Sequence, residues 1–406
     1  MTIGAAVRYA FLALALAPFA YYLLAIFASL QFFRAAKRNP AMDSADSTDS
    51  ADTGGLPDSR AEFTPGISIL KPIRGLDRET YENYASFCEQ DYPDFELLFG
   101  VSDESDPAIP EIGRLIRNYP SRSIRLLIGS EPLGVSDKVN KLCRMAREAR
   151  HEIILVSDSD VRVEPEFLRA MAAPFRDPAV GGVTCLYRGL AGISVPAILE
   201  ALGNTADFVP GVLVARLFGP LNFMLGAVMV TRKAQLAEIG GFESLADYFC
   251  DDYELGNRIA ASGRRVVLSG FPVSIVYPRE TLNEAFRHQL RWNLSIRFSR
   301  PWGHFGLLFS QGLPWAILGA AIAPSAPVAA GYLGAYLVLR CALAYVAGAW
   351  GMQDETVRER WRLLPLRDAF AFAVWVASFF PQRIHWRDRE FYVRDKRLVP
   401  AEPRQP

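Results

Sequence analysis

The chain has 406 residues, of which half are hydrophobic and 12% aromatic, and its 44 Lys and Arg residues balance 44 Asp and Glu residues. This composition excludes a disordered chain, which has too little apolar surface to bury, and a strongly basic nucleic-acid-binding protein. The length suffices for two or three domains. Long uncharged stretches alternate with short charged blocks, a pattern typical of a membrane protein with a soluble part.

The cysteines indicate no covalent or metal framework. They are odd in number, far apart and without C-x-x-C spacing: Cys88, Cys143, Cys185, Cys250 and Cys341. Neither a disulfide scaffold nor a structural zinc site fits this pattern. We therefore expect a reducing compartment.

An uncharged run, Tyr9–Phe33, lies near the start of the chain. At 1.5 Å per residue it is long enough to cross a bilayer core of roughly 30 Å, and it exceeds the apolar segment of a signal peptide, about 7–15 residues. We interpret residues 1–35 as an uncleaved transmembrane anchor. Three basic residues within 34–38 follow the run and one precedes it, so the positive-inside rule predicts that the next part of the chain is cytoplasmic.

Residues 36–65 are rich in Asp, Ser, Thr and Gly and have almost nothing apolar to bury, which predicts a disordered tether. Over residues 66–300, short apolar strands alternate with helical stretches. The expected strands begin at Ile67, Phe95, Ile124 and Glu152, and the expected helices are Thr80–Gln90, Ala108–Asn118 and Lys138–Ala149. This alternation predicts an α/β domain with a mostly parallel sheet flanked by helices, in which ligands bind at the carboxyl ends of the strands.

Two further uncharged runs, Phe305–Ala323 and Ala326–Trp350, predict a membrane hairpin. The alternative is a pair of buried helices in a soluble core. The run Ala369–Phe380 is too short to span a bilayer and is flanked by arginines, which favours an interfacial or re-entrant segment. We assign residues 301–385 to the hairpin and this segment, and residues 386–406 to a charged cytoplasmic tail.

Two carboxylates, Asp158 and Asp160, directly follow the apolar segment Ile153–Val156. Residues two apart in an extended segment point to the same side, so both carboxylates can face one ligand. A hard divalent cation, Mg²⁺ or Mn²⁺, suits such oxygen ligands together with a substrate diphosphate. The alternative is an Asx turn that ends the strand.

Three further acidic positions are candidates. Asp103 follows the second expected strand, where a carboxylate is equally consistent with a simple turn. Asp251 and Asp252 begin a helical segment, so they either complement the helix dipole or provide a general base for an acceptor hydroxyl.

A basic stretch from Arg287 contains Arg291 and Trp292. It is either a cationic anchor at the membrane interface or a set of cations and an indole that neutralise a departing diphosphate.

In this order, these features resemble a family of membrane-bound inverting glycosyltransferases with the GT-A fold, and most closely its ceramide glucosyltransferase branch, with this chain as a bacterial member. The N-terminal transmembrane helix and C-terminal membrane region belong to the resemblance. It also rests on the segments Leu70-Lys-Pro-Ile-Arg-Gly, Phe87-Cys-Glu-Gln-Asp-Tyr-Pro, Gly134-Val-Ser-Asp-Lys, Arg232-Lys233 and Gly240-Gly241-Phe242.

The resemblance implies a role for each candidate. Asp103 would hold the uracil and ribose of a UDP-sugar, and Lys138 would lie near the nucleotide. Asp158 and Asp160 look like the D-x-D element that binds Mg²⁺ or Mn²⁺ and the diphosphate. Asp252 would be the catalytic base that deprotonates the acceptor.

Arg291 and Trp292 match the end of the family's Q/R-x-x-R-W motif and would contribute to the donor site. The chain departs from that motif at His288, which stands where the family has Gln or Arg, with Gln289 beside it. A histidine can donate a hydrogen bond but is a weaker permanent cation.

The resemblance implies transfer of glucose from UDP-glucose to the primary hydroxyl of the membrane lipid ceramide, with inversion, by a catalytic domain on the cytoplasmic face of a bacterial inner membrane. The alternative acceptor is a hopanoid polyol or another membrane lipid, with GlcNAc or glucose as the sugar. A processive polysaccharide synthase would need more spans than the three expected here. A silenced receptor or scaffold would lack a metal or base carboxylate, whereas Asp158, Asp160 and Asp252 are all present.

Overall fold

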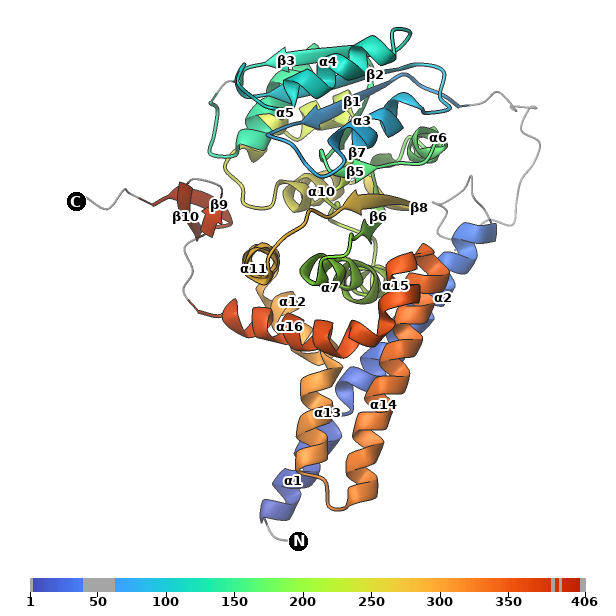
Figure 1. Ribbon diagram of the computed structural model, residues 1–406, viewed down its shortest axis with the longest axis vertical. Coiled ribbons are helices and arrows are strands. Elements are labelled where there is room, and N and C mark those ends of the chain that lie inside the picture. Colours follow the sequence, from blue (N-terminus) through green and yellow to red (C-terminus); the bar gives the residue numbers. More distant parts are fainter. Residues whose placement is uncertain (1–2, 39–62, 131, 381–383, 387–388, 402–406) are drawn as a thin grey trace. The chain divides into compact units, whose positions relative to one another are not determined.

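The computed structural model describes residues 3–38, 63–130, 132–380, 384–386 and 389–401 (Figure 1). Most of the predicted tether and the end of the predicted tail lie outside the described residues. The chain forms two compact units. We call residues 34–186 and 220–276 the α/β unit, and residues 1–33, 187–219 and 277–406 the helical unit.

An eight-stranded sheet forms the centre of the α/β unit, in the order β3-β2-β1-β4-β7-β6-β8-β5. Its strands are β1 (Ile67–Pro72), β2 (Phe95–Val101), β3 (Ser123–Ile128), β4 (Ile153–Ser157), β5 (Val161–Arg162), β6 (Val180–Leu190), β7 (Val228–Arg232) and β8 (Arg265–Val276). β3, β2, β1 and β4 are parallel, whereas β7 runs antiparallel to β4 and β6. The four predicted strands and the mostly parallel α/β sheet are therefore confirmed.

Burial explains why these strands could be recognised. Every residue of β1, β2 and β4 is buried, as expected for a parallel sheet that is covered on both faces. The predicted helices between them are also present, as α3 (Thr80–Cys88), α4 (Ile109–Asn118) and α5 (Asp137–Glu148). Ser136 caps the start of α5, because its side chain accepts a hydrogen bond from the Val139 backbone N–H, which is the usual way to satisfy a helix N-terminus.

Three further helices lie in the α/β unit. They are α6 (Phe167–Ala172), α9 (Lys233–Glu238) and α10 (Asp251–Ala261). α10 begins with the two adjacent carboxylates predicted from the sequence.

The helical unit consists largely of helices, most of them apolar. They are α1 (Ile3–Leu14), most of α2 (Ala17–Arg38), α7 (Val195–Gly203), the π-helix η2 (Asn204–Phe208), α8 (Val209–Leu217), α11 (Leu282–Ser299), α12 (Pro301–Gly306), α13 (Gly312–Ala321), α14 (Ala326–Ala344), the π-helix η5 (Tyr345–Met352), α15 (Glu355–Arg360) and α16 (Leu364–Ala377). A small antiparallel sheet follows, of β9 (Ile384–Trp386), β10 (Arg389–Arg394) and β11 (Arg397–Pro400).

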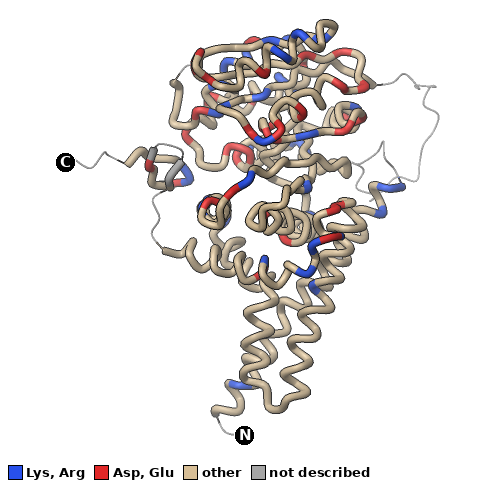
Figure 2. The backbone as a smooth tube through the Cα atoms, in the orientation of Figure 1, with Lys and Arg blue, Asp and Glu red and all other residues tan. Residues whose placement is uncertain are grey.

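Three helices of the described chain are long and apolar enough to cross a membrane: Gly4–Arg38, Val195–Leu217 and Ala326–Met352. Protein covers 78% of the apolar window of Val195–Leu217 but only 33% and 39% of the other two windows. Figure 2 shows that α1, α13 and α14 carry few charged residues. Gly4–Arg38 and Ala326–Met352, the two outer apolar helices, therefore offer apolar surface to a bilayer. Val195–Leu217 packs mainly against protein.

The first arm of the predicted hairpin, Phe305–Ala323, is not one continuous helix. Residues 301–310 form α12 and a 3₁₀ turn, and the apolar helix α13 has only 10 residues. α13 packs closely on α14, because a Cβ on Gly319 would lie 2.6 Å from the Tyr332 ring. Leu12 and Phe19 join the same apolar cluster, so α1, α2, α13 and α14 form one bundle.

α16 runs across the direction of α13 and α14 (Figure 1). It contains most of the run Ala369–Phe380 that the sequence suggests is interfacial or re-entrant. Its placement at a membrane, like the predicted domain boundaries, stays a prediction.

Candidate active site

Three segments of the α/β unit meet at the carboxyl end of β4. Asp158 directly follows β4, and its Oδ1 lies 2.7 Å from Nζ of Lys138 in the first turn of α5. The same Nζ lies 3.9 Å from Oδ2 of Asp251 at the start of α10. The structure thus brings two predicted site residues, Lys138 and Asp158, into direct contact and adds Asp251.

Lys138 is held as a cation in this group. Burial alone would lower the pKa of its ammonium, but the carboxylates of Asp158 and Asp251 outweigh burial, so that the pKa is raised above its ordinary value. A permanent positive charge therefore lies at the edge of the sheet where α/β proteins bind ligands.

Asp160 lies in the turn between β4 and β5. Burial, together with the nearby carboxylates of Asp158 and Asp77, raises the pKa of Asp160 to about 7. Two neighbouring carboxylates that are costly to ionise together gain most from a divalent cation placed between them. The oxygen ligands and charge of Asp158 and Asp160 therefore fit the predicted Mg²⁺ or Mn²⁺.

Lys71 is a site residue that the sequence reasoning missed. It is fully buried in β1, and its Nζ donates to the backbone oxygen of Asp158 at 2.9 Å and to Oγ of Ser157 at 3.3 Å. The ammonium also lies 3.8 Å from the centre of the Phe87 ring. Burial lowers the pKa of Lys71 to about 7, against the opposite effect of Asp160 and Asp158. The sequence signal that could have identified Lys71 is a lysine within a strand of mostly apolar residues.

The adjacent carboxylates of α10 have different surroundings. Asp251 faces Lys138, whereas Oδ1 of Asp252 accepts hydrogen bonds from Sγ–H of Cys250 at 3.1 Å and from the Tyr253 backbone N–H at 2.8 Å. Burial and the charge of Asp251 raise the pKa of Asp252 to about 6. A Cβ on Gly226 would lie 3.0 Å from Oδ2 of Asp252, so the glycine lets the backbone approach this oxygen. A carboxylate with a raised pKa has the property expected of a general base.

Asp103 lies apart from this group, in the exposed loop after β2. Its Oδ1 accepts hydrogen bonds from the Ser105 backbone N–H at 2.9 Å and from the Ser105 hydroxyl, and these bonds lower the pKa of Asp103. β2 and β4 flank β1 in parallel, so at about 4.8 Å per strand their ends are about 10 Å apart. Asp103 thus stabilises its own loop on the same edge of the sheet as Asp158.

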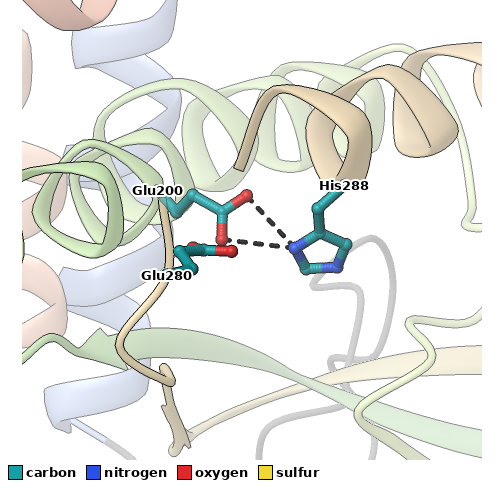
Figure 3. Close-up of side chains that lie close together, drawn as sticks. All are labelled: Glu200, Glu280 and His288. Carbon is teal, nitrogen blue, oxygen red and sulfur yellow. Dashed lines mark hydrogen bonds and ion pairs between the residues drawn. The ribbon is translucent and has the colours of Figure 1, made fainter. Parts of the chain in front are cut away.

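The remaining predicted residues, Arg291 and Trp292, lie on α11 in the helical unit. His288, one turn earlier, points Nδ1 at Glu200, with distances of 3.1 and 3.2 Å to the two carboxylate oxygens (Figure 3). The His288 and Trp292 rings pack edge to face with centres 4.8 Å apart. Glu200 was not predicted from the sequence, because its partner His288 lies 88 positions away along the chain.

Comparison with known proteins places these residues in a family. Residues 22–399 match the protein family described as glycosyl transferase family 21. The chain belongs to this family. The match covers most of the chain and confirms the predicted class, a glycosyltransferase. The curated relatives confirm the resemblance to ceramide glucosyltransferases.

Curated relatives of this family 21 chain are ceramide glucosyltransferases. Ceramide glucosyltransferase 1 of Caenorhabditis elegans is 30% identical over 237 residues, which cover 56% of this chain and 49% of the relative. The ceramide glucosyltransferase of Komagataella phaffii is 37% identical over 102 residues, which cover 24% of this chain and 20% of the relative. The chain thus matches about half the length of its curated relatives or less.

Solved glycosyltransferase structures are more distant from the family 21 chain. The mannosyltransferase PcManGT from Pyrobaculum calidifontis, in complex with GDP-Man and Mn²⁺, has 19% identity and a TM-score of 0.49, and the alignment covers 91% of this chain and 99% of that one. TarS residues 1–349 from S. aureus have 14% identity and a TM-score of 0.40, with 84% and 97% covered.

Proposed function

We propose that this family 21 chain transfers glucose from UDP-glucose to the primary hydroxyl of ceramide, with inversion at the anomeric carbon. The observation that carries the proposal is the grouping of Lys138, Asp158 and Asp251 at the carboxyl end of β4. Curated relatives named ceramide glucosyltransferases support the choice of sugar and lipid.

The donor would bind along this edge of the sheet. Lys138 supplies a fixed positive charge for the diphosphate, and Lys71 holds the backbone of Asp158 through a hydrogen bond to its carbonyl oxygen. Asp158 and Asp160 would hold Mg²⁺ or Mn²⁺, which when bound adds positive charge to stabilise the diphosphate as it leaves. Asp103, on the same edge, would contact the uracil and ribose, and Arg291 with Trp292 would complete the donor site.

The reaction is a single displacement in which Asp252 acts as base. The acceptor oxygen forms a bond to the anomeric carbon from the side opposite the diphosphate, and the bond between that carbon and the diphosphate oxygen breaks. The hydroxyl proton passes to the carboxylate of Asp252 as attack proceeds, and the electron pair leaves with UDP. Such general-base assistance typically contributes about 10²–10⁴-fold to the rate.

The acceptor would reach this site from a bilayer. Leu23, Phe27 and Val338 of the two outer apolar helices are 57%, 58% and 69% exposed, so large apolar side chains are available to contact lipid. Basic residues lie in the last turn of α2 and in the last turn of α15, which follows η5. They favour a cytoplasmic location for the carboxyl ends of both outer apolar helices. A cytoplasmic active site on a bacterial inner membrane would meet the soluble UDP-sugar and the lipid on the same side.

The test is transfer by the purified full-length chain in detergent with each of three labelled donors, UDP-glucose, UDP-GlcNAc and UDP-galactose. Each donor is offered with ceramide, a hopanoid polyol or diacylglycerol, and lipids are separated after extraction. We expect label in ceramide from UDP-glucose alone, with a β-anomeric proton coupling in the product. Label in a hopanoid polyol but not in ceramide would overturn the acceptor, and an α-linked product would overturn inversion.

A further inference from the structure

A second group of side chains with metal-binding chemistry lies in the helical unit, where it shares no residue with the Asp158 and Asp160 pair. It consists of Glu200 on α7, Glu280 just before α11 and His288 on α11 (Figure 3). One ligand atom from each of the three residues lies within 4.8 Å of the other two. Both carboxylates and the imidazole point toward a common centre in Figure 3.

The two carboxylates have little positive charge to balance them. Glu200 is fully buried, and within the described part of the chain its only ion-pair partner is His288. Oε1 of Glu280 is also buried and has no hydrogen-bond partner among the described residues. Buried carboxylates are costly unless a cation or a proton neutralises them, so a cation bound among these side chains would stabilise them.

The geometry suits a small cation with mixed nitrogen and oxygen ligands. Zn²⁺ binds imidazole nitrogen and carboxylate oxygen at about 2.0–2.2 Å, so ligands around a tetrahedral ion are roughly 3.3 Å apart. Nδ1 of His288 lies 3.1 and 3.2 Å from the carboxylate oxygens of Glu200. These atoms already have about the spacing that the ion requires, and the ion would take the place of the proton between Nδ1 and Glu200.

Gln289 orients the site from behind. Its side chain is buried, and its Nε2 donates to Oε1 of Glu200 at 3.0 Å. A ligating carboxylate is usually held by such a hydrogen bond on one oxygen. Oε2 of Glu200 then remains to face the cation.

We propose that Glu200, Glu280 and His288 form a second metal site, which binds Zn²⁺. The zinc ligand His288 stands where the family motif has Gln or Arg. Both of those residues are poor zinc ligands, so the motif itself does not imply this site. The ion would join α7 to α11 and fix the His288 ring against Trp292, so it would position the motif helix. This inference is independent of which sugar or lipid the enzyme uses.

Zinc content tests the proposal directly. The purified full-length chain, stripped with chelating resin, is equilibrated with Zn²⁺, dialysed and analysed by mass spectrometry. We expect about one Zn²⁺ per chain in the wild type and less than about a tenth of that in Glu280→Gln and His288→Gln. Glu359→Gln, whose side chain is 68% exposed, is the matched control and should bind like the wild type.

A second variant and a second measurement separate this site from the diphosphate site and from misfolding. The double variant Asp158→Asn and Asp160→Asn should keep its zinc. Thermal unfolding should shift upward with added Zn²⁺ in the wild type but not in His288→Gln, because a ligand stabilises only the form that binds it. Retention of zinc by Glu280→Gln and His288→Gln, or absence of zinc in the wild type, would overturn the site and leave a shared proton as the occupant.

Discussion

Nζ of Lys138 lies 2.7 Å from Oδ1 of Asp158, although one residue belongs to α5 and the other to the loop after β4. This contact neutralises one carboxylate of a group that also includes Asp160, Asp251 and Asp252. Burial, with the charge of neighbouring carboxylates as the second cause, raises the pKa values of Asp160 and Asp252. The candidate site therefore has a fixed cation, Lys138, for a diphosphate. Its remaining carboxylates would be stabilised by a bound metal cation.

The first prediction is metal dependence at Asp160. Asp160→Asn keeps the volume of the side chain but removes a charged oxygen ligand, so Mn²⁺ affinity should fall by more than about 100-fold. Transfer should fail in the variant, and in the wild type with excess EDTA. Mn²⁺ binding by electron paramagnetic resonance, alongside lipid glycosylation, measures both effects.

Asp94→Asn is the matched control for this prediction, because its carboxylate is 65% exposed and pairs only with His151 among the described residues. It should bind Mn²⁺ and transfer sugar like the wild type. Full turnover by Asp160→Asn, or by the wild type in EDTA, would require the metal assignment to be abandoned.

The sequence predicted the central strands because parallel strands covered on both faces consist of nearly continuous apolar residues, as in β1 and β4. The antiparallel partner β7 was not predicted, because five residues between helical segments carry no comparable signal. The division of the expected first hairpin arm into α12 and α13 also escaped the sequence reasoning, since hydropathy does not record where a helix breaks.

Residues beside the ends of strands and helices were easier to predict from the sequence than residues whose partners lie far away along the chain. Asp158 directly follows an apolar strand, so its position could be inferred from local order, whereas Lys138 was predicted only through the family resemblance. Arg340 appeared only as a lone charge in an apolar run, and its partners Asp207 and Asp368 are 133 and 28 positions away. Glu200 was hidden for the same reason, because long-range pairing leaves no local pattern.

The second prediction concerns the stability of the helical unit. Arg340 is 2% exposed, and its Nη2 donates to Oδ1 of Asp368 at 2.7 Å while Asp207 accepts another bond. Arg340→Met leaves the Asp368 carboxylate buried without its cation, which should cost about 3–5 kcal/mol. Thermal unfolding in detergent, followed by tryptophan fluorescence, should show a clearly lower midpoint.

Two companion variants make this measurement specific. Arg360→Met removes a cation whose side chain is 51% exposed, and it should leave the midpoint unchanged. Arg340→Met with Asp368→Leu removes both charges and should recover much of the loss. If Arg340→Met unfolds at the wild-type temperature, the buried pair does not hold α14 to α16.

The third prediction is the orientation of α14 in the membrane. The apolar helix Ala326–Met352 has 27 residues, or about 40 Å at 1.5 Å per residue, more than the roughly 30 Å of a bilayer core. Its two ends should therefore lie on opposite sides. An impermeant maleimide added to intact cells should label Ser325→Cys but not Glu359→Cys, because the proposed cytoplasmic side carries the arginines of α15.

Permeabilised cells provide the control for labelling, since both variants should then react, and the wild type sets the background from its five native cysteines. Strong labelling of Glu359→Cys from outside intact cells would contradict the cytoplasmic assignment.

The fourth prediction is the identity and pH dependence of the base. The pKa of Asp252 is raised to about 6 by burial and by Asp251, and only the ionised carboxylate can accept the acceptor proton. The ratio kcat/KM should therefore be steady above this pH and fall as the pH drops through about 6, by about tenfold per further pH unit. Initial rates from pH 5 to 8 at subsaturating donor measure the profile.

Asp252→Asn keeps the volume of the side chain and removes its basicity, so it should lower turnover by about 10²–10⁴-fold. UDP-sugar binding should change little, because it depends on Asp103, Lys138, Asp158 and Asp160 in the proposed site. Asp251→Asn is the matched neighbour and should affect turnover less, since Asp251 faces Lys138. Donor calorimetry and turnover are measured on both variants: an inactive Asp251→Asn with an active Asp252→Asn would show that the other carboxylate is the base, and loss of donor binding in both would assign this segment to the nucleotide site.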